Sequence, residues 1–449
     1  MLLRTLSVDV SRARTPVVLN ESSLRVAIDP QQGLREQEQR TLSKYLNIRR
    51  SGDRWAVSRR SRYAGLVQVG GTSYWLEPPF EPASFVYLLL LRRGARQAAD
   101  RAYAIASNRR DRSLRGLMRV LAVTMVTEAE RLAAGHIAQS YETRIERTGL
   151  VRGRPLWHKQ DGRPADGKVT CRFMEKSTDT LENRLILAGL AAAARWVGAG
   201  PERAVLRTQQ HVWRSIADPF VPARHDFDRA DLRLNRLTDG YRPALSLARA
   251  LLFGFDLTTS APNTPVYAPV FDLADLFETL VQLVAETAAA GTGLEVRAQT
   301  SEKRSILTQS GETYRRIRPD LVVSRRGAPV LVVDSKFKSK YATGGPTPAA
   351  PHRISREDIF QTFFYAIRIA QRNGLNHPVP AAVAAPLLAG ATPPSPDYRQ
   401  VHWGEDLSDV AARLTLLLIP VDEAVAAVHA GNVSYCRGLF AETDLFQSD

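Results

Sequence analysis

Apolar residues recur along this chain with different spacings, and each spacing predicts a different kind of segment. Up to about residue 80, short apolar runs alternate with Gly, Asp and Ser, which predicts β-strands joined by turns. Between residues 82 and 150, apolar positions recur every three or four residues, as on one side of a helix. Further helices are predicted over about 179–199, 201–214 and 241–255. The pattern therefore predicts an α/β protein with more than one domain.

The last part of the chain follows a more regular order of predicted elements. The first element is a helix to about 289, at whose start Asp272 resembles a cap and Asp275 its reciprocal acid. Strands follow over 294–298, 314–323 and 330–337, then a helix to about 372 that Ser355 caps, and a buried strand over 381–388. This order is αβββαβ, and strands near 399–403 and 414–419 would extend the same sheet.

These patterns divide the chain into three expected parts. Residues 1–150 form a β-rich and then helical N-terminal region. Residues 151–262 form a linker and a helical middle region, and the stretch 149–167, rich in Gly, Pro and charge, is either a linker or a long hairpin. Residues 263–449 form the C-terminal α/β domain.

Composition narrows the class of partner and of site. The 449 residues include 61 Lys and Arg against 46 Asp and Glu, a formal net charge of +15, which favours a polyanionic partner, nucleic acid before membrane. The two cysteines exclude a disulfide framework and a multi-cysteine zinc site. No apolar run reaches the roughly 18 residues of a membrane-spanning helix, and the first residues do not read as a secretory signal, so a cytoplasmic protein is expected.

The lysines are unevenly placed. Only eight of the 61 basic residues are lysines, and Lys336, Lys338 and Lys340 fall within five residues. Because a compact ammonium group and a planar guanidinium are not interchangeable, this cluster either arises by chance or marks a position that needs lysine.

Two aspartates flank the predicted hairpin in the same region. Asp320 lies seven residues before Gly327, and Asp334 lies seven residues after it. Pairing that is symmetric about Gly327 would place the two carboxylates directly opposite each other, where like charges are destabilising unless they share a proton or bind a cation. Strand alternation would put Lys336 and Lys338 on the same face as Asp334.

Such a group suits hydrolysis of a phosphodiester. Two carboxylates offer the hard oxygen ligands that Mg²⁺ prefers, and the bound metal would activate water and neutralise charge on the phosphate. Lys336 would orient the nucleophile or stabilise the developing charge. The alternative is an ordinary hairpin in which Asp334 forms a surface salt bridge with a lysine.

The motifs then resemble a known group of enzymes. Pro319-Asp320 with Asp334-Ser335-Lys336 resembles the PD-(D/E)xK nuclease motif. The wider chain resembles the McrC family, the nuclease subunit of modification-dependent restriction complexes. The resemblance rests on four blocks in order: Cys171 with Thr178 to Arg184; Phe271-Asp272 with Leu276-Phe277-Glu278; the nuclease motif with Phe337-Lys338; and Asp358 with Gln361 and Tyr365. The N-terminal region matches only loosely, and Ser335 stands where the family often has Ala.

This resemblance implies a restriction-endonuclease-like C-terminal domain that cleaves DNA with Mg²⁺ or Mn²⁺. Asp320 and Asp334 would be metal ligands and Lys336 the catalytic lysine. Glu278 would be a third acid that reaches the metal, although its helix face also fits a solvated stripe. The implied partners are double-stranded DNA and a ring-forming AAA+ GTPase or ATPase, which the N-terminal region would bind and stimulate.

Further residues near the motif, Lys338 among them, are expected to contact DNA or to support the site. Asp358, Gln361 and Tyr365 share one helix face and would contact the DNA backbone or support Lys336, or else form a plain polar face. Arg318 would hold a phosphate through its guanidinium, as would Arg315 and Arg316. In the 178–184 block, Thr178 or Asp179 is expected to cap a helix, and Asn183 and Arg184 would contact DNA or another domain.

Other chemistries are not supported by the sequence. No histidine pair has zinc-protease spacing, and no phosphate-binding P-loop is found, so this chain is expected to bind no nucleotide itself. The alternative function is a regulatory, DNA-binding adaptor with a degenerate nuclease fold. The three intact residues Asp320, Asp334 and Lys336 argue against that alternative.

Overall fold

The chain divides by its internal contacts into two compact units. In this computed structural model the described residues are 17–19, 26–28, 43, 45–51, 54–60, 62–69, 72–92, 94–107, 113–135, 137–159, 167–253, 270–298, 306–307, 313–315, 318–338, 341, 354–389, 391, 400–403, 412–443 and 445–446. The first unit comprises Met1–Arg92, Ala102–Gly116 and Asp256–Asp449, and the second comprises 93–101 and 117–255. The first unit thus combines both ends of the chain.

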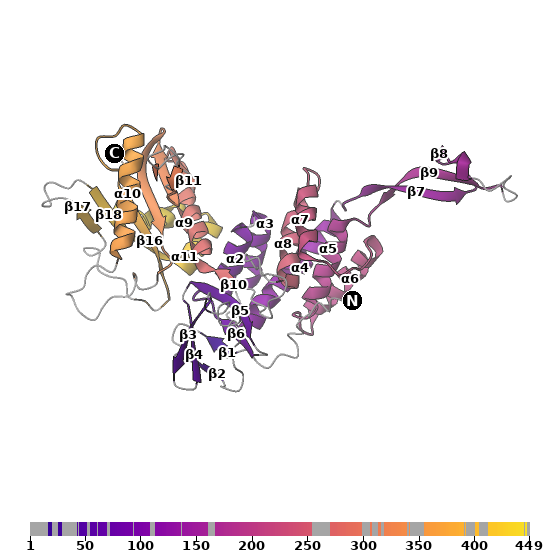
Figure 1. Cartoon of the computed structure of the whole chain (residues 1–449), viewed down its shortest axis with the longest axis horizontal. Coiled ribbons are helices and arrows are strands. Elements are labelled where there is room, and N and C mark those ends of the chain that lie inside the picture. Colours follow the sequence, from indigo (N-terminus) through magenta and orange to yellow (C-terminus); the bar gives the residue numbers. More distant parts are fainter. Residues whose placement is uncertain are drawn as a thin grey trace. The chain divides into compact units, whose positions relative to one another are not determined.

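The first unit contains a six-stranded mixed sheet (Figure 1). Its strands, in spatial order, are β11 (Leu294–Ala298), β14 (Leu321–Arg325), β15 (Ala328–Ser335), β16 (Ala381–Leu387), β18 (Ala412–Pro420) and β17 (Gln400–Trp403). The β15–β16 and β16–β18 pairs are parallel, and the other pairs are antiparallel. Apart from the small pair β12 (Ile306–Leu307) and β13 (Thr313–Arg315), the element order agrees with the predicted αβββαβ.

The β14–β15 hairpin combines a tight turn with a bulge. Arg326 and Gly327 form the turn with φ of +52° and +84°, and positive φ at both central residues is typical of a type I′ hairpin turn. The turn pairs Ser324 with Pro329, but Val330 is an extra residue, beyond which Val323 pairs with Leu331. The bulge therefore restores, for the rest of the hairpin, the register that is symmetric about Gly327, as predicted.

Two helices cover the two faces of this sheet. Helix α10 (Arg356–Arg372) packs on β15, β16 and β18, and its buried Ile369 and Ala370 lie against Val322 and Val332. Helix α9 (Leu273–Ala289) also contacts β15. Consecutive residues of β14 and β15 are buried, which requires cover on both faces, so α9 lies on the face opposite α10.

The N-terminal strands are tied to the start of α9. The chain reaches α9 through β10 (Val270–Asp272), which pairs with β5 in a four-stranded sheet. Asp272 caps α9 by accepting from the amide of Ala274 at 3.0 Å, as predicted, and it forms an ion pair with Arg62 at 2.6 Å. The N-terminal strands are β1 (Val17–Leu19), β2 (Val26–Ile28), β3 (Leu46–Ser51), β4 (Arg54–Arg59), β5 (Tyr63–Val69) and β6 (Thr72–Leu76).

Helix α2 (Pro82–Arg92) is the central helix of the first unit. All of its residues from 82 to 90 are buried, because α9 and α11 (Val421–Ala430) pack against it. A helix that is apolar on all sides needs such cover. The unit is completed by α12 (Val433–Gly438), the short η6 (Ala441–Thr443) and part of α3 (Arg96–Ala106).

The second unit is a helical bundle that carries a long hairpin (Figure 1). Its helices are α4 (Leu114–Ala134, mainly from Leu117), α5 (Leu181–Ala193), α6 (Pro201–Ile216), α7 (Arg224–Arg233), η3 (Asp239–Tyr241) and α8 (Arg242–Phe253). The hairpin is formed by β7 (Ser140–Thr148) and β9 (Val169–Ser177), with β8 (Arg154–Pro155) and η2 (Trp157–Lys159) between them. Of the two interpretations of 149–167, the described residues agree with the long hairpin, because β7 and β9 pair on either side of this stretch.

The start of α5 corrects two expectations for the 178–184 block. Thr180, rather than Thr178 or Asp179, caps the helix by accepting from the amide of Asn183. Asn183 is fully buried, donates to the carbonyls of Ala138 and Thr178, and accepts from the hydroxyl of Tyr241. Because its amide is used inside the unit, Asn183 is a structural residue and not a DNA contact.

The prediction for the second unit concerns Gly189, where α5 and α8 touch. A Cβ at Gly189 would lie 2.5 Å from the Cβ of Ala248, closer than carbon atoms can approach. We expect Gly189→Ala to lower the free energy of unfolding by about 1–3 kcal/mol, measured as a lower midpoint in thermal and urea unfolding. Gly198→Ala is the control, since a Cβ there meets nothing within 4 Å. Equal stability of the two variants would contradict the close packing.

No described helix is both long enough and apolar enough to cross a membrane.

Candidate functional site

The predicted acidic pair lies at one end of the β14–β15 hairpin. Asp320 immediately precedes β14, and Asp334 is the penultimate residue of β15. Leu321 pairs with Val333, so the register continues directly to Asp320 and Asp334. The side chain of Asp334 is almost completely buried, with 2% of its residue surface exposed. The structure thus brings the two carboxylates together.

Each carboxylate is held by one of its oxygens. Oδ2 of Asp320 accepts from the backbone amide of Ser335 at 2.7 Å. Oδ2 of Asp334 forms an ion pair with Nζ of Lys336 at 2.7 Å, and the hydroxyl of Thr362 lies 3.5 Å from the same oxygen. Among the described residues no hydrogen bond is made to Oδ1 of either aspartate, so these two oxygens remain as possible ligands.

The site holds an excess of buried negative charge. Burial and the neighbouring charge of Asp334 raise the pKa of Asp320 to about 7, even though the Ser335 amide and Lys336 oppose the shift. Burial also raises the pKa of Asp334, against the effect of Lys336. Burial alone would lower the pKa of Lys336, but the charge of Asp334 and their hydrogen bond raise it above its ordinary value. Lys336 is therefore a cation at neutral pH.

Helix α10 orients Lys336. The ammonium group of Lys336 donates to Oε1 of Gln361 at 3.2 Å, and Nε2 of Gln361 donates to the hydroxyl of Tyr365 at 2.7 Å. These two contacts fix which way the Gln361 amide points. Of the two predicted roles for Gln361, DNA contact or support of Lys336, the geometry agrees with support.

Lys338 belongs to a neighbouring network rather than to the acidic pair. It forms an ion pair with Asp358 at 2.5 Å, and Asp358 also accepts from the hydroxyl of Tyr341. That hydroxyl accepts from the amide of Ser355, the residue that caps α10. Burial opposes ionisation of Asp358, but hydrogen bonds from Lys338 and Tyr341 lower its pKa overall. The network fastens the segment after β15 to the start of α10.

The remaining predicted residues lie at the margin of the site. Glu278 projects from α9 and its charge contributes to the raised pKa of Asp320. However, within the described ranges no three His, Cys, Asp or Glu side chains are close enough to hold a metal ion together, so Glu278 does not form a three-acid set with the pair. Arg318 is exposed beside Pro319. For Arg315 only the backbone is described, and Arg316 and Lys340 lie outside the described residues.

Sequence reasoning missed two partners of the site. Thr362 lies against Asp334 and donates to the carbonyl of Asp358 at 2.7 Å, and Tyr341 joins Lys338 to α10. Thr362 follows Gln361 on α10, and its position one turn after Asp358 was the available signal. Tyr341 lies in a Gly- and Pro-rich stretch with no pattern that could indicate its contacts.

The donor set fits a divalent cation. Mg²⁺ is commonly bound by one or two carboxylates together with waters and phosphate oxygens. Asp320 and Asp334 supply two carboxylates, each with one oxygen outside the hydrogen bonds among described residues. Burial is the main cause of the raised pKa of Asp320 and the charge of Asp334 is the second, and a divalent cation would offset that charge.

Comparisons with known proteins give a family match and a fold match. The family model described as McrBC 5-methylcytosine restriction system component matches residues 81–375, well over half of the chain. A chain in a refined half-complex from a tetradecameric assembly of Thermococcus gammatolerans McrB AAA+ hexamers with bound McrC has a similar fold. Its TM-score is 0.58 at 14% identity, with 94% of this chain and 100% of that chain covered. A chain of the cryo-EM structure of the Thermococcus gammatolerans McrBC complex matches with a TM-score of 0.43 at 18% identity, covering 62% of this chain and 88% of that one. No curated protein matches the sequence.

The raised pKa of Asp320 predicts how stability depends on pH. Between pH 4 and 7 the folded state retains a proton that the unfolded state has lost, so this group makes stability fall as pH rises, and the loss is complete above pH 7. In a chelator, we expect Asp320→Asn to be roughly 1–3 kcal/mol more stable than the unmodified protein at pH 8 and nearly equal at pH 4, measured by urea unfolding. Glu357→Gln, at an exposed acid on α10, should not show this difference. If the free energy of unfolding changes with pH in the same way for the unmodified protein and for Asp320→Asn, Asp320 does not have a raised pKa.

Proposed function

This chain belongs to the family of McrBC 5-methylcytosine restriction system components, and from that premise we propose that it is a metal-dependent DNA endonuclease. The observation that carries the proposal is the pair formed by the buried Asp334 and the half-buried Asp320 beside the ammonium group of Lys336. Its position at the end of a hairpin in an αβββαβ order supports a PD-(D/E)xK nuclease domain. The net charge of +15 suits a DNA substrate.

We assign Asp320 and Asp334 as ligands of Mg²⁺ or Mn²⁺, with Glu278 as a more distant acid. When bound, the cation would activate water and neutralise negative charge on the phosphate. The carboxylates hold this position because the Ser335 amide and Lys336 fix one oxygen of each. Two ligands leave room for waters and for a phosphate oxygen.

Lys336 acts as a charge stabiliser and hydrogen-bond donor. An ammonium group has three N–H bonds, and Asp334 and Gln361 accept two of them. The third is available to the attacking water or to the scissile phosphate. Because its pKa is raised, Lys336 stays protonated at neutral pH and does not serve as the general base. Gln361 and Tyr365 orient it, and Asp358 with Lys338 holds the adjoining backbone.

The test of this chemistry is a pair of conservative substitutions. Asp334→Asn removes a metal ligand, and Lys336→Gln removes the ammonium group, so each should reduce Mg²⁺-dependent DNA cleavage by about 100-fold or more. Cleavage is measured on plasmid DNA with the partner ATPase or GTPase present. Glu357→Gln is the control, because this exposed acid lies on the same helix that supports the site.

The same measurements separate a nuclease from the alternative, a DNA-binding adaptor. Undiminished cutting by both Asp334→Asn and Lys336→Gln would place the active site elsewhere. An unmodified protein that binds DNA equally with and without Mg²⁺, and never cleaves it, would be an adaptor.

We further propose that the chain works on a ring of AAA+ subunits. The structure from Thermococcus gammatolerans contains McrB AAA+ hexamers with bound McrC, and its fold match covers nearly all of this chain. No P-loop is found in this chain, so the partner would hydrolyse the nucleotide.

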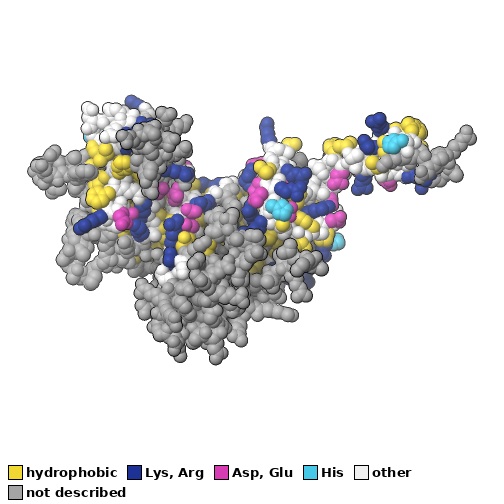
Figure 2. All heavy atoms as spheres, viewed as in Figure 1, with side chains coloured by type: hydrophobic (Ala, Val, Ile, Leu, Met, Phe, Trp, Pro, Cys, Tyr) yellow, Lys and Arg dark blue, Asp and Glu magenta, His cyan; other side chains and the backbone are white. Residues whose placement is uncertain are grey.

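The β7–β9 hairpin is the surface that we assign to this partner. Six of the large apolar side chains that are exposed among the described residues lie on it, and they appear as yellow spheres along the hairpin (Figure 2): Tyr141, Ile145, Leu150, Val151, Trp157 and Met174. Leu150 is 78% exposed and Trp157 is 71% exposed. Apolar groups gathered on an exposed element mark a protein-binding surface.

Replacing the aromatic anchor of this surface should weaken partner binding. We expect Trp157→Ser to reduce affinity for the AAA+ ring about tenfold or more, since buried Trp side chains are frequent hot spots of interfaces. Binding is measured by light scattering or interferometry with the nucleotide-bound ring. Leu237→Ser is the control, because Leu237 is 88% exposed in the same unit but lies off the hairpin. A loss with Leu237→Ser alone would assign the partner to another surface.

A further inference from the structure

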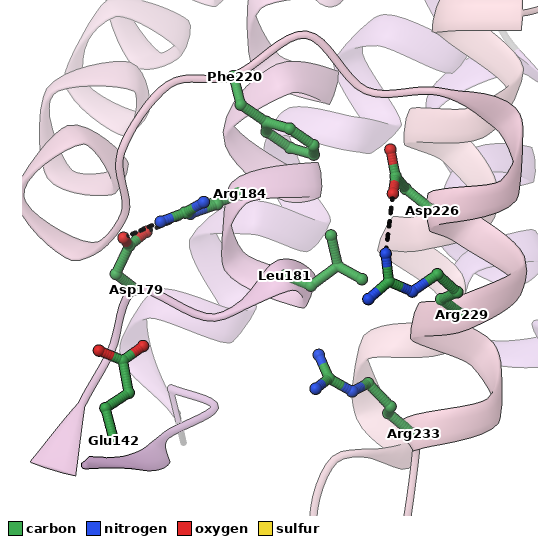
Figure 3. Close-up of a pocket in the computed structure, with 8 residues that line it drawn as sticks. All are labelled: Glu142, Asp179, Leu181, Arg184, Phe220, Asp226, Arg229 and Arg233. Carbon is green, nitrogen blue, oxygen red and sulfur yellow. Dashed lines mark hydrogen bonds and ion pairs between the residues drawn. The ribbon is translucent and has the colours of Figure 1, made fainter.

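A cavity lies in the second unit, near the base of the β7–β9 hairpin (Figure 3). The cavity has a volume of about 350 Å³ and is lined by residues from β7, the start of α5, the segment after α6, and α7. Leu181 and Phe220 are its apolar lining residues. The others are three arginines and three acids, and their pairing determines what the cavity could bind.

Two of the three acids already accept hydrogen bonds from neighbouring groups of the protein. Asp179 accepts two hydrogen bonds from the guanidinium of Arg184 and one from the amide of Asp218 at 2.9 Å, and these bonds lower its pKa although burial opposes them. Asp226 accepts from the amide of Ala223 at 2.8 Å, which caps α7. Asp179 and Arg184 therefore form a neutral pair, and the Asp226 carboxylate has a structural role.

Two arginines on α7 are not neutralised in the same way. Arg229 and Arg233 lie one helical turn apart, and both extend toward the cavity (Figure 3). Arg229 forms a long ion pair with Asp226 at 3.8 Å, beyond hydrogen-bond distance (Figure 3), and no ion pair is found for Arg233 within the described part of the chain. Two guanidinium groups one turn apart can hold the oxygens of a single phosphoryl group from two sides.

From this arrangement we propose that the cavity binds a phosphoryl group through Arg229 and Arg233. The phosphoryl group belongs either to a free phosphate compound or to a nucleic-acid backbone, since both present the same oxygens. Glu142 lies on the opposite wall, and its negative charge brings the formal charge of the lining side chains to zero. The inference concerns the second unit alone and holds whether or not the first unit cleaves DNA.

The test measures binding of pyrophosphate and inorganic phosphate to the full chain by calorimetry, in a chelator. We expect Arg229→Gln/Arg233→Gln to bind pyrophosphate at least tenfold more weakly than the unmodified protein. Arg207→Gln is the matched control, since Arg207 is exposed on α6 and does not line the cavity, and its affinity should change less than twofold. Glu142→Gln should bind about two- to threefold more tightly, because it removes the negative charge from the opposite wall. Because a misfolded protein would not bind pyrophosphate more tightly, a gain with Glu142→Gln also shows that this variant keeps its fold.

A second arm identifies the source of the phosphoryl group. Binding of labelled single-stranded and duplex DNA is measured by anisotropy over a range of salt. If the nucleic-acid backbone is the ligand, the double variant loses affinity for DNA. The slope of log affinity against log salt concentration also becomes shallower, by the equivalent of about one or two phosphate contacts. If a free phosphate compound is the ligand, DNA binding is unchanged while pyrophosphate binding falls. Wild-type affinity of the double variant for both ligands, or no phosphate binding by the unmodified protein at millimolar concentration, would overturn the proposal.

Discussion

The close approach of two carboxylates, one buried and one half-buried, is the constraint on which the candidate site of the first unit depends. Asp320 and Asp334 face each other at the end of a hairpin, and burial with mutual charge raises the pKa of Asp320 to about 7. A protein tolerates such a pair only where surrounding groups hold it in place. Here the Ser335 amide and the Lys336 ammonium group do so, and each leaves one carboxylate oxygen outside its hydrogen bonds. The arrangement has an unfavourable charge in the metal-free protein and is suited to a cation.

The two helices that flank the sheet support different parts of this arrangement. Helix α10 contributes the polar contacts, through Gln361 to Lys336 and through Asp358 to Lys338. Helix α9 contributes an apolar contact, in which the rings of Phe277 and Phe337 meet with centroids 5.8 Å apart. The segment that carries both lysines is therefore fixed from both sides, although it lies just beyond the end of β15. A site made in this way is rigid because its supporting groups belong to regular elements.

The second unit contributes different surfaces. Its hairpin exposes apolar side chains that a monomeric protein would normally bury. Its cavity contains two guanidinium groups, of which Arg229 forms a long ion pair with Asp226 and Arg233 forms none within the described residues. Both features would be stabilised by the binding that we propose. They differ in what they would bind, since one is an apolar surface for a protein and the other offers two guanidinium groups to a phosphoryl group.

The sequence alone determined the αβββαβ order, the caps at Asp272 and Ser355, and the register that opposes Asp320 to Asp334, because these depend on local spacing and on turn chemistry. It did not reveal the Val330 bulge that restores this register, since a bulge depends on how both strands pair. Helix α7 was missed because few of its residues are apolar, so the arginine wall of the cavity had no periodic signal. Likewise, only the tertiary structure joined β10 to the N-terminal sheet, enclosed Asn183 and separated Lys338 from Lys336. These outcomes rest on contacts between residues far apart in the chain, which spacing along a sequence does not contain.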